Sequence, residues 1–93
     1  MKTVHLVSKH KWFELIAAGV KCEDYREIKP YYKKLETLKR GDTIIFHKGY
    51  SKVIVKAEAI YCWRSFGIGS WGGEPEKVQW VIGFRTYEAY YQH

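Results

Sequence analysis

The sequence predicts a small α+β protein, in which four or five strands form an antiparallel or mixed sheet that curls into a small barrel, with a helix at its side or end. Three observations support this prediction. Apolar residues recur at helical spacing near the N-terminus, several later segments alternate with a period of two, and turn residues join the later strands directly. The 93 residues make one domain, 1–93. An apolar fraction of 46% is enough for a core without disulfide bonds.

The first half of the chain is expected to hold two strands and two helices. The segment Thr3–Ser8 alternates between two faces that are both partly apolar, which predicts a central strand. The segment Cys22–Ile28 is expected to form the second strand, which Pro30 would end. After this proline, Tyr31–Leu38 can form a short helix with charged residues facing outward.

The first helix is expected from about His10 to Ala18. Its apolar face would consist of Trp12, Leu15 and Ile16, because Leu15 and Ile16 follow Trp12 at spacings of three and four and so share one side of a helix. Gly19 follows at the position where a left-handed residue commonly ends a helix. The charged segment after Gly19 therefore leaves a rigid helix end, which is a suitable scaffold for a site.

The second half is expected to contain three strands joined by turns. Alternation is clearest between Lys52 and Trp63, which predicts a long strand. Thr43–Lys48 and Val78–Phe84 are the other two predicted strands, and turn residues precede and follow the first of them, at 40–42 and 49–51. Consecutive strands with short connections favour antiparallel pairing in this half.

The net charge of +6 is concentrated in the first 40 residues. Residues 1–40 carry ten basic and five acidic side chains, whereas residues 41–93 carry six and five. A basic half favours an anionic partner such as RNA, DNA or a nucleotide. A solvated lysine-rich surface that keeps the protein in solution explains the charge equally well.

Cysteine and hydropathy patterns indicate a cytoplasmic protein without a membrane partner. Cys22 and Cys62 form neither a disulfide framework nor a zinc motif, which fits a reducing compartment. The first ten residues have no apolar core typical of a signal peptide, and no run approaches the roughly 20 apolar residues that span a bilayer. The four histidines match no metal-binding pattern, so we expect no metal or other cofactor. A monomer is favoured.

The segment from Gly19 to Glu27 is the strongest candidate for a site. A strand places Cys22, Asp24 and Arg26 on one face, with Lys21 immediately before them. One interpretation is a surface strand with compensating charges. The other is a polar pocket, in which Lys21 and Arg26 neutralise a phosphate. Lys21 could also move a proton if burial or Arg26 lowers its pKa, an effect that Asp24 would oppose.

A glycine-rich loop at 66–75 is the second candidate. Gly67–Gly72 matches the dinucleotide fingerprint G-x-G-x-x-G, but Gly73, Glu74 and Pro75 follow where the fingerprint requires a helix. We therefore exclude dinucleotide binding. The loop is then either a flexible surface segment or a wall over a pocket, with Trp71 as a stacking surface.

Further ligand contacts are expected from aromatic side chains and from the start of the first helix. Trp71 is the first candidate for base stacking and Tyr50 the second. The wider set of possible stacking residues also contains Trp12, Tyr31, Tyr32 and Trp63. Lys9 and His10 precede or begin the helix, where a phosphate could bind at the N-terminus.

Two series of residues resemble the ASCH domain family, in particular its small single-domain bacterial and phage type. The first series is Lys11–Lys21, Glu23–Glu27 and Lys29–Tyr31, and the second is Phe46, Gly49–Lys52 and Gly69–Pro75. The similarity extends over nearly the whole chain, and the element G-x-K-x-x-[DE]-x-R is fairly specific. The resemblance implies a PUA-like fold, a small mixed β-barrel of about five or six strands with one or two flanking helices.

The resemblance also implies two functions. ASCH domains are proposed to bind RNA in a cleft lined by the motif residues, and some members are hydrolases that act on N4-acetylcytidine or on RNA. In the amidohydrolase type, a lysine acts with a threonine three residues later and with a distant glutamate. Lys21 matches the lysine, Asp24 stands in place of the threonine, and Glu74 is the candidate glutamate.

Three hypotheses follow. The first is a module that binds RNA or a nucleotide or nucleoside through Lys9, Lys21 and Arg26, with Trp71 and Tyr50 stacking on bases. The second is a small hydrolase, an amidohydrolase or ribonuclease, with Lys21 as general base and Asp24 or Glu74 as its partner. The third concerns the aromatic tail at 85–93, which is expected to be helical or to pack on the sheet. In this hypothesis, its segment Tyr87–Tyr91 covers a protein partner or a second copy of the chain.

Overall fold

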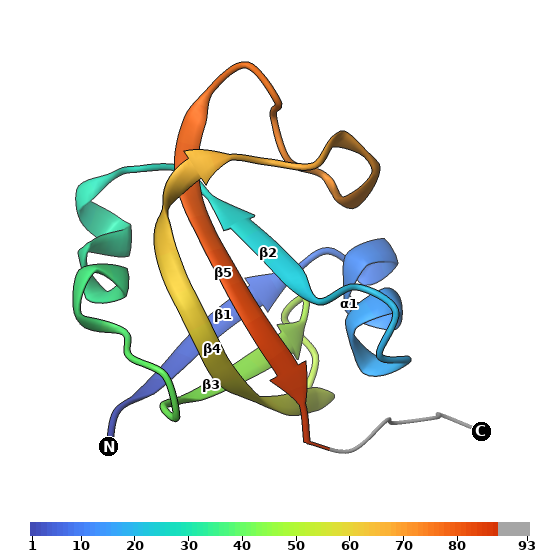
Figure 1. Ribbon diagram of the computed structural model, residues 1–93. Coiled ribbons are helices and arrows are strands. Elements are labelled where there is room, and N and C mark those ends of the chain that lie inside the picture. Colours follow the sequence, from blue (N-terminus) through green and yellow to red (C-terminus); the bar gives the residue numbers. More distant parts are fainter. Residues whose placement is uncertain (88–93) are drawn as a thin grey trace.

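The structure is a computed structural model that describes residues 1–87 (Figure 1). These residues form five strands, one α-helix and two 3₁₀ helices: β1 Thr3–Ser8, α1 His10–Ala17, β2 Glu23–Arg26, η1 Pro30–Thr37, β3 Thr43–Lys48, β4 Ile54–Phe66, η2 Gly69–Trp71 and β5 Val78–Thr86. The predicted α+β class is therefore confirmed. β5 includes Arg85 and Thr86, which the sequence assigned to the tail, and the other expectations for the tail lie outside the described residues.

All five strands belong to one mixed sheet in the order β1-β3-β4-β5-β2. β1 pairs with β3 in parallel, and the other neighbouring pairs are antiparallel. The prediction that Thr3–Ser8 is a central strand is wrong, because β1 lies at one edge of the sheet. Val4, Leu6 and Ser8 face the interior, whereas Val7 is exposed, so its apolar side chain does not indicate a second buried face.

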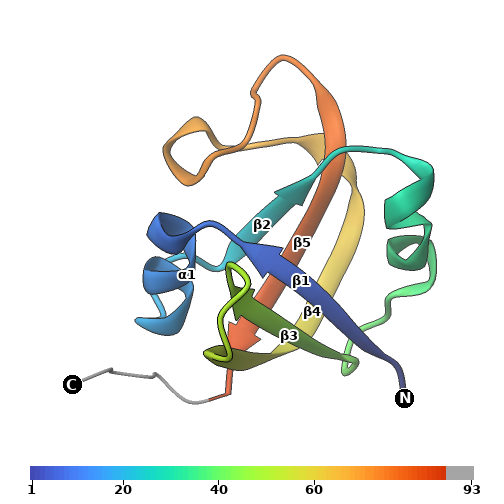
Figure 2. The ribbon, with the colours of Figure 1, turned by 180° about the vertical axis from the view of Figure 1, so that it is seen from behind.

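The sheet curls until its two edges approach each other. β4 is 13 residues long and carries a bulge between Ala59 and Tyr61, which increases the local bend. Figures 1 and 2 show β4 and β5 sweeping across the molecule as long curved ribbons. Across the remaining gap, Arg26 of the β2 edge donates from Nη1 to the carbonyl oxygen of Val7 on the β1 edge at 2.9 Å. A side chain therefore joins the two edges where the backbone ladder is open.

The helices lie on opposite sides of the curled sheet (Figures 1 and 2). α1 buries Phe13, Ile16 and Ala17, which share one side of the helix at spacings of three and four. The predicted apolar face was one residue out of phase, because Trp12 and Leu15 are only partly buried. On the η1 side, the buried residues are Leu35 of η1 and Leu38, which follows it. These side chains form one apolar core with inward residues of β1, β3, β4 and β5: Val4, Leu6, Ile44, Phe46, Val55, Ala57, Ala59, Trp80, Ile82 and Phe84. The inward residue of β2 is the buried, charged Asp24.

Within residues 1–87, no helix is long and apolar enough to cross a bilayer.

Candidate functional site

Three charged side chains are packed together at the open seam of the sheet. Lys21 is 2% exposed and Asp24 is 4% exposed. Lys21 Nζ lies 3.2 Å from Asp24 Oδ1, and Arg26 Nε lies 2.7 Å from Asp24 Oδ2. The predicted common face of Asp24 and Arg26 is present, because the two residues alternate along β2. These residues form a buried Lys21–Asp24–Arg26 triad.

The end of α1 positions Lys21 for this contact. Gly19 adopts a left-handed conformation with φ of +77°, as its place after the helix predicted. The amide nitrogens of Val20 and Lys21 then both donate to the carbonyl oxygen of Leu15 at 3.0 Å. This closed helix end turns the chain inward and starts β2 two residues later. Cys22, which was expected on the same face as Asp24, precedes the strand and is exposed.

The triad has one carboxylate for two cations. Burial lowers the pKa of the Lys21 ammonium, Asp24 opposes this effect, and Arg26 reinforces it. Burial also disfavours the Arg26 guanidinium, but the Asp24 carboxylate and the Tyr32 hydroxyl outweigh it and raise the pKa of Arg26. With both bases protonated, the buried group carries a net charge of +1. An anionic ligand would complete its neutralisation.

Arg26 also contacts β1 and η1. Its Nη2 lies 3.4 Å from Ser8 Oγ, and its Nη1 lies 3.4 Å from the Tyr32 hydroxyl. The guanidinium carbon sits 5.8 Å from the centre of the Tyr32 ring, a distance typical of cation–π contacts. Arg26 is thus held from three sides, and its position is coupled to the closure of the sheet.

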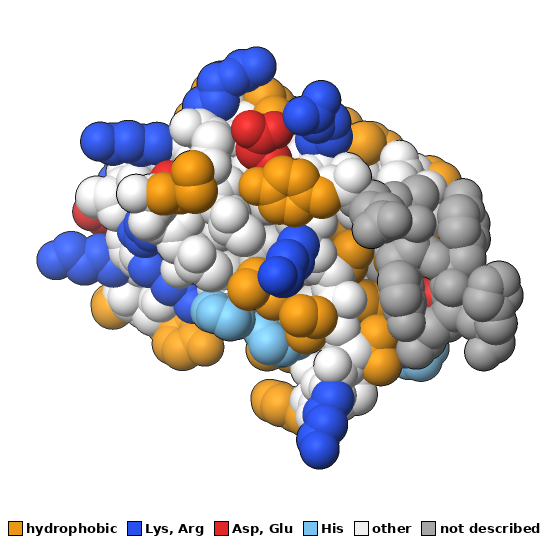
Figure 3. Space-filling model, turned by 90° about the horizontal axis from the view of Figure 1, so that it is seen from below, with side chains coloured by type: hydrophobic (Ala, Val, Ile, Leu, Met, Phe, Trp, Pro, Cys, Tyr) orange, Lys and Arg blue, Asp and Glu red, His pale blue; other side chains and the backbone are white. Residues whose placement is uncertain are grey.

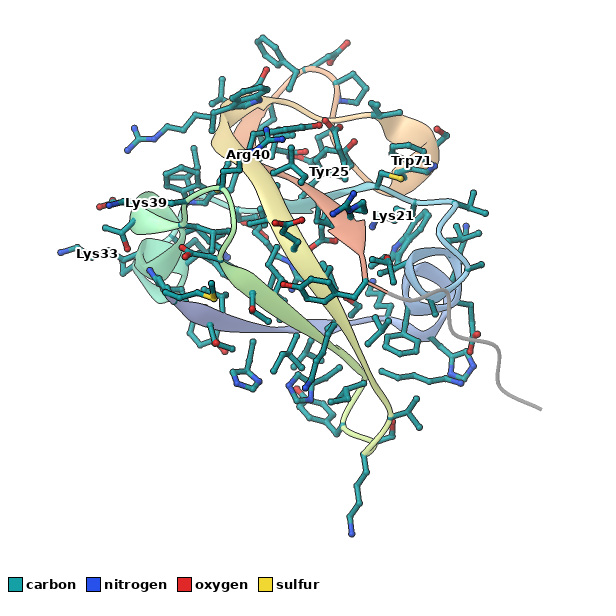
Figure 4. All side chains as sticks on the ribbon, turned by 60° about the horizontal axis from the view of Figure 1, so that its bottom comes forward. Lys21, Tyr25, Lys33, Lys39, Arg40 and Trp71 are labelled. Atoms are coloured by element: carbon teal, nitrogen blue, oxygen red, sulfur yellow. The ribbon has the colours of Figure 1, made fainter. Side chains whose placement is uncertain are left out.

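A pocket of about 460 Å³ opens above the triad. This volume is typical of pockets that bind small molecules. Its lining comes from six parts of the chain: Val7, Ser8, Lys9, Trp12, Lys21, Asp24, Tyr25, Arg26, Glu27, Tyr32, Trp71, Gly72, Glu74 and Gln79. Figure 4 shows Lys21 and Trp71 close together on the same side of the molecule. Buried charges therefore form the floor of the pocket, and aromatic side chains form much of its wall.

The glycine-rich loop is the wall that the second interpretation predicted. Gly72 has a φ of +86°, and a Cβ added to it would lie 2.9 Å from the Trp12 ring. A glycine is therefore needed for the loop to pack directly on Trp12. On the other side, the amide of Glu74 donates to Gln79 Oε1 at 3.0 Å. These contacts hold Trp71 and Trp12 at the same pocket.

The structure brings some predicted site residues into the pocket and leaves others outside. Lys9 lines the rim at the start of α1 and is exposed. Glu74 also lines the pocket, but its side chain is 61% exposed and its Oε2 lies 3.7 Å from Lys77 Nζ. Tyr50 is fully exposed in the β3–β4 turn and does not line the pocket. His10 is exposed and faces Glu14 at 3.5 Å.

Several lining residues were not assigned to the site from the sequence. Trp12 and Tyr32 were in the wider stacking set only. Ser8 is a polar residue at an inward position of β1, and this break in the apolar alternation was a usable signal. Gln79 is buried at the start of β5, where nothing in the local pattern separates it from a solvated glutamine. Tyr25 lines the pocket too, although its hydroxyl donates to Glu23 at 2.7 Å.

Within residues 1–87, no three histidine, cysteine or acidic side chains are placed to share a metal ion. No model of a known protein family matches the chain, and no curated protein sequence gives a significant match. The chemistry of the site must therefore be argued from the pocket itself. Its parts are a buried cationic floor, two tryptophan rings, and rim carboxylates that have their own lysine partners, Glu27 with Lys29 and Glu74 with Lys77.

Proposed function

We propose that the chain is an ASCH-type domain and that this pocket binds one nucleotide, either free or within RNA. The observation that carries the proposal is the buried triad with its net charge of +1 beneath Trp12 and Trp71. A base has an extended aromatic face and a phosphate has negative charge, so a nucleotide matches both features of the pocket. Both cysteines are free thiols, which supports an origin in the reducing cytoplasm.

Hydrogen-bonding capacity indicates where the ligand would bind. An ammonium group has three hydrogens, and among the described residues Asp24 accepts one from Lys21 at 3.2 Å. The remaining hydrogens of this buried group are available to acceptor atoms of a ligand. Asp24 has no comparable freedom, because one oxygen faces Lys21 and the other faces Arg26. We therefore assign binding to the lysine and a structural role to the carboxylate.

The test compares two lysines that lie over the same ring. Lys21 Nζ is 4.8 Å and Lys11 Nζ is 4.6 Å from the centre of the Trp12 ring, but Lys11 does not line the pocket. Binding of the four common nucleoside monophosphates would be followed by tryptophan fluorescence and calorimetry. We expect Lys21→Met to weaken binding at least about tenfold, as loss of a charge-assisted hydrogen bond predicts. Lys11→Met should bind like the wild type.

Equal affinities of both variants and the wild type would contradict this assignment. A second readout is the pH dependence. Because burial lowers the pKa of Lys21, its charge is lost at a lower pH than that of an ordinary lysine. Affinity for a phosphate should therefore fall as the pH rises through the lowered pKa. The fall should be absent in Lys21→Met and present in Lys11→Met.

A hydrolase is the second candidate, and the lowered pKa of Lys21 favours it. A neutral amine can act as a general base, and Arg26 could stabilise negative charge that develops in the transition state. The exposed Glu74 carboxylate would need to move inward to take part. The assay is incubation with N4-acetylcytidine and with RNA, followed by chromatography of the products. Turnover that survives Lys21→Met, with Lys11→Met as control, would exclude this mechanism.

A further inference from the structure

We infer that the outer surface of η1 contacts the backbone of a single-stranded nucleic acid whose neighbouring nucleotide occupies the pocket. This inference rests on the proposed function, and it extends the ligand from one nucleotide to a strand. The η1 surface is defined here as Tyr31 and Lys33 of η1 together with Lys39 and Arg40, which follow it. None of these side chains lines the pocket.

The first observation is the concentration of charge. Residues 29–40 contain five basic side chains and one acidic side chain, so this segment carries +4 of the net charge of +6. On the left of Figure 3, the side on which η1 lies, several basic side chains project from the surface. Such a concentration of one sign attracts a polyanion, whereas charges added only for solubility are usually interspersed with the opposite sign.

The second observation is that three of these cations have no partner. Lys29 pairs with Glu27, and Lys34 donates to the carbonyl oxygen of His5 at 3.0 Å. By contrast, the charged groups of Lys33, Lys39 and Arg40 are exposed and make no hydrogen bond or ion pair within residues 1–87. They can therefore contact phosphates without first breaking an ion pair.

The third observation is an exposed aromatic ring next to the pocket. Tyr31 is 73% exposed, and its ring meets the edge of Tyr32 at a centroid distance of 4.9 Å. Tyr32 lines the pocket and contacts Arg26. A base stacked on Tyr31 would therefore lie beside a nucleotide in the pocket, and such stacking contributes about 1–3 kcal/mol per base. An acidic lipid surface would also attract the cations, but continuity with the pocket favours a strand.

The dimensions separate a strand from a mononucleotide. η1 has eight residues with a kink at Tyr32, and a 3₁₀ helix rises about 2.0 Å per residue, so η1 is at most about 16 Å long, and Lys39 and Arg40 follow its end. Figure 4 shows Lys33, Lys39 and Arg40 toward the η1 side and Lys21 and Trp71 on the other side. A single nucleotide held in the pocket would not reach these cations. Their removal should affect the binding of a strand and leave a mononucleotide unaffected.

The experiment uses two triple variants with the same change in charge. The test variant is K33A/K39A/R40A, and the control is K52A/K56A/R85A, whose residues are exposed and lie outside η1 and the pocket. Fluorescence anisotropy measures the affinity for a labelled short single-stranded RNA and for DNA of the same sequence. Salt is varied between about 50 and 200 mM, a range over which phosphate contacts change affinity strongly.

Three phosphate contacts contribute about 2.1 to the slope of log affinity against log salt for a single strand, at about 0.7 each. Across this fourfold range of salt, the wild type should lose about 18-fold more affinity than the test variant. The control variant should keep the slope of the wild type. Tyr31→Ala should weaken RNA binding about 5- to 150-fold, whereas Tyr50→Ala, at another exposed tyrosine, should not.

The inference is overturned if the test and control variants share one slope, or if the wild type binds anionic vesicles and no oligonucleotide. Failure of the pocket gives a different result. If mononucleotides do not bind while RNA binding still depends on K33A/K39A/R40A, the proposed pocket function is wrong and the η1 contact stands. A parallel loss of mononucleotide and RNA binding in a test variant that is still folded would also overturn the inference, because the η1 cations would then not act on the strand alone. Thermal unfolding of each variant separates these cases.

Discussion

Replacement of Asp24 by asparagine is the most direct test of the buried triad. Asparagine preserves the shape of the side chain and removes the single carboxylate that two cations share at 3.2 and 2.7 Å. Removing one member of a buried ion pair typically costs about 3–5 kcal/mol, because the remaining charge is left uncompensated. Here two cations would be left. Domains of this size have a free energy of unfolding of about 5–15 kcal/mol, so Asp24→Asn should remove a large part of it.

The loss of stability in Asp24→Asn should also depend on pH in a definite direction. Asp24 opposes the lowering of the Lys21 pKa, so its removal lowers that pKa further. Between the folded pKa of Lys21 and its unfolded value of about 10.4, the unfolded chain binds more protons than the folded chain. The free energy of unfolding therefore rises with pH in that window. The defect of Asp24→Asn should consequently be larger at about pH 7 than at about pH 9.

Urea denaturation followed by the fluorescence of the four tryptophans measures both values. The double variant Lys21→Met/Asp24→Asn is the control, because it removes one of the uncompensated cations and should recover part of the loss. A loss below about 1 kcal/mol at pH 7, or a defect that grows as the pH rises, would refute the assigned electrostatics.

Three further predictions concern the residues around the site. Gly72→Ala should lower the free energy of unfolding by about 1–2 kcal/mol, because φ is +86° and the new Cβ would meet Trp12 at 2.9 Å. Nucleotide affinity, measured beside thermal unfolding, should fall as the loop shifts. An unchanged affinity would contradict the role of the loop as a wall. Gly83→Ala should cost about 1–3 kcal/mol in urea denaturation, because its Cβ would overlap the Tyr61 ring, which stacks on Trp63 at 4.3 Å. Burial raises the pKa of the Cys62 thiol to about 11, so a thiol reagent near neutral pH should label the exposed Cys22 before Cys62. Fast labelling that persists in Cys22→Ser would contradict this order.

Local patterns in the sequence predicted the elements better than their positions in the sheet. The bounds of β1 and β3 agree with the predicted strands because alternating residues end at clear turn or helix signals. The helix ends at Ala17, just before the left-handed Gly19 that indicated its end. The edge position of β1 was not predictable in the same way. Pairing depends on contacts between distant segments, and one apolar residue on the outer face of a strand, here Val7, is compatible with either place.

The candidate site follows the same division. Lys21, Asp24 and Arg26 could be identified because charge in a short strand beside a helix end is unusual, and period two placed two of them together. Gln79 could not, because it becomes a pocket residue only when β5 is brought beside β2, whereas Ser8 gave one signal as a polar residue at an inward position of β1. Glu74 shows the converse limit. Its loop was located correctly at the pocket, but the direction of its carboxylate, toward Lys77, depends on side-chain geometry that spacing does not encode.

The position of the triad supports the proposal that the pocket binds a ligand. Buried ion pairs are often no more stabilising than apolar residues of the same size, so an apolar seam would close the sheet at least as well. Arg26 does join the edges, through Val7 and Ser8, and this contact alone would explain an arginine with one aspartate. Lys21 has no such contact with β1. It adds a second cation to a carboxylate that is already paired, and it faces a pocket walled by two tryptophans. The proposed anionic aromatic ligand would account for this extra charge, whereas closure of the sheet would not.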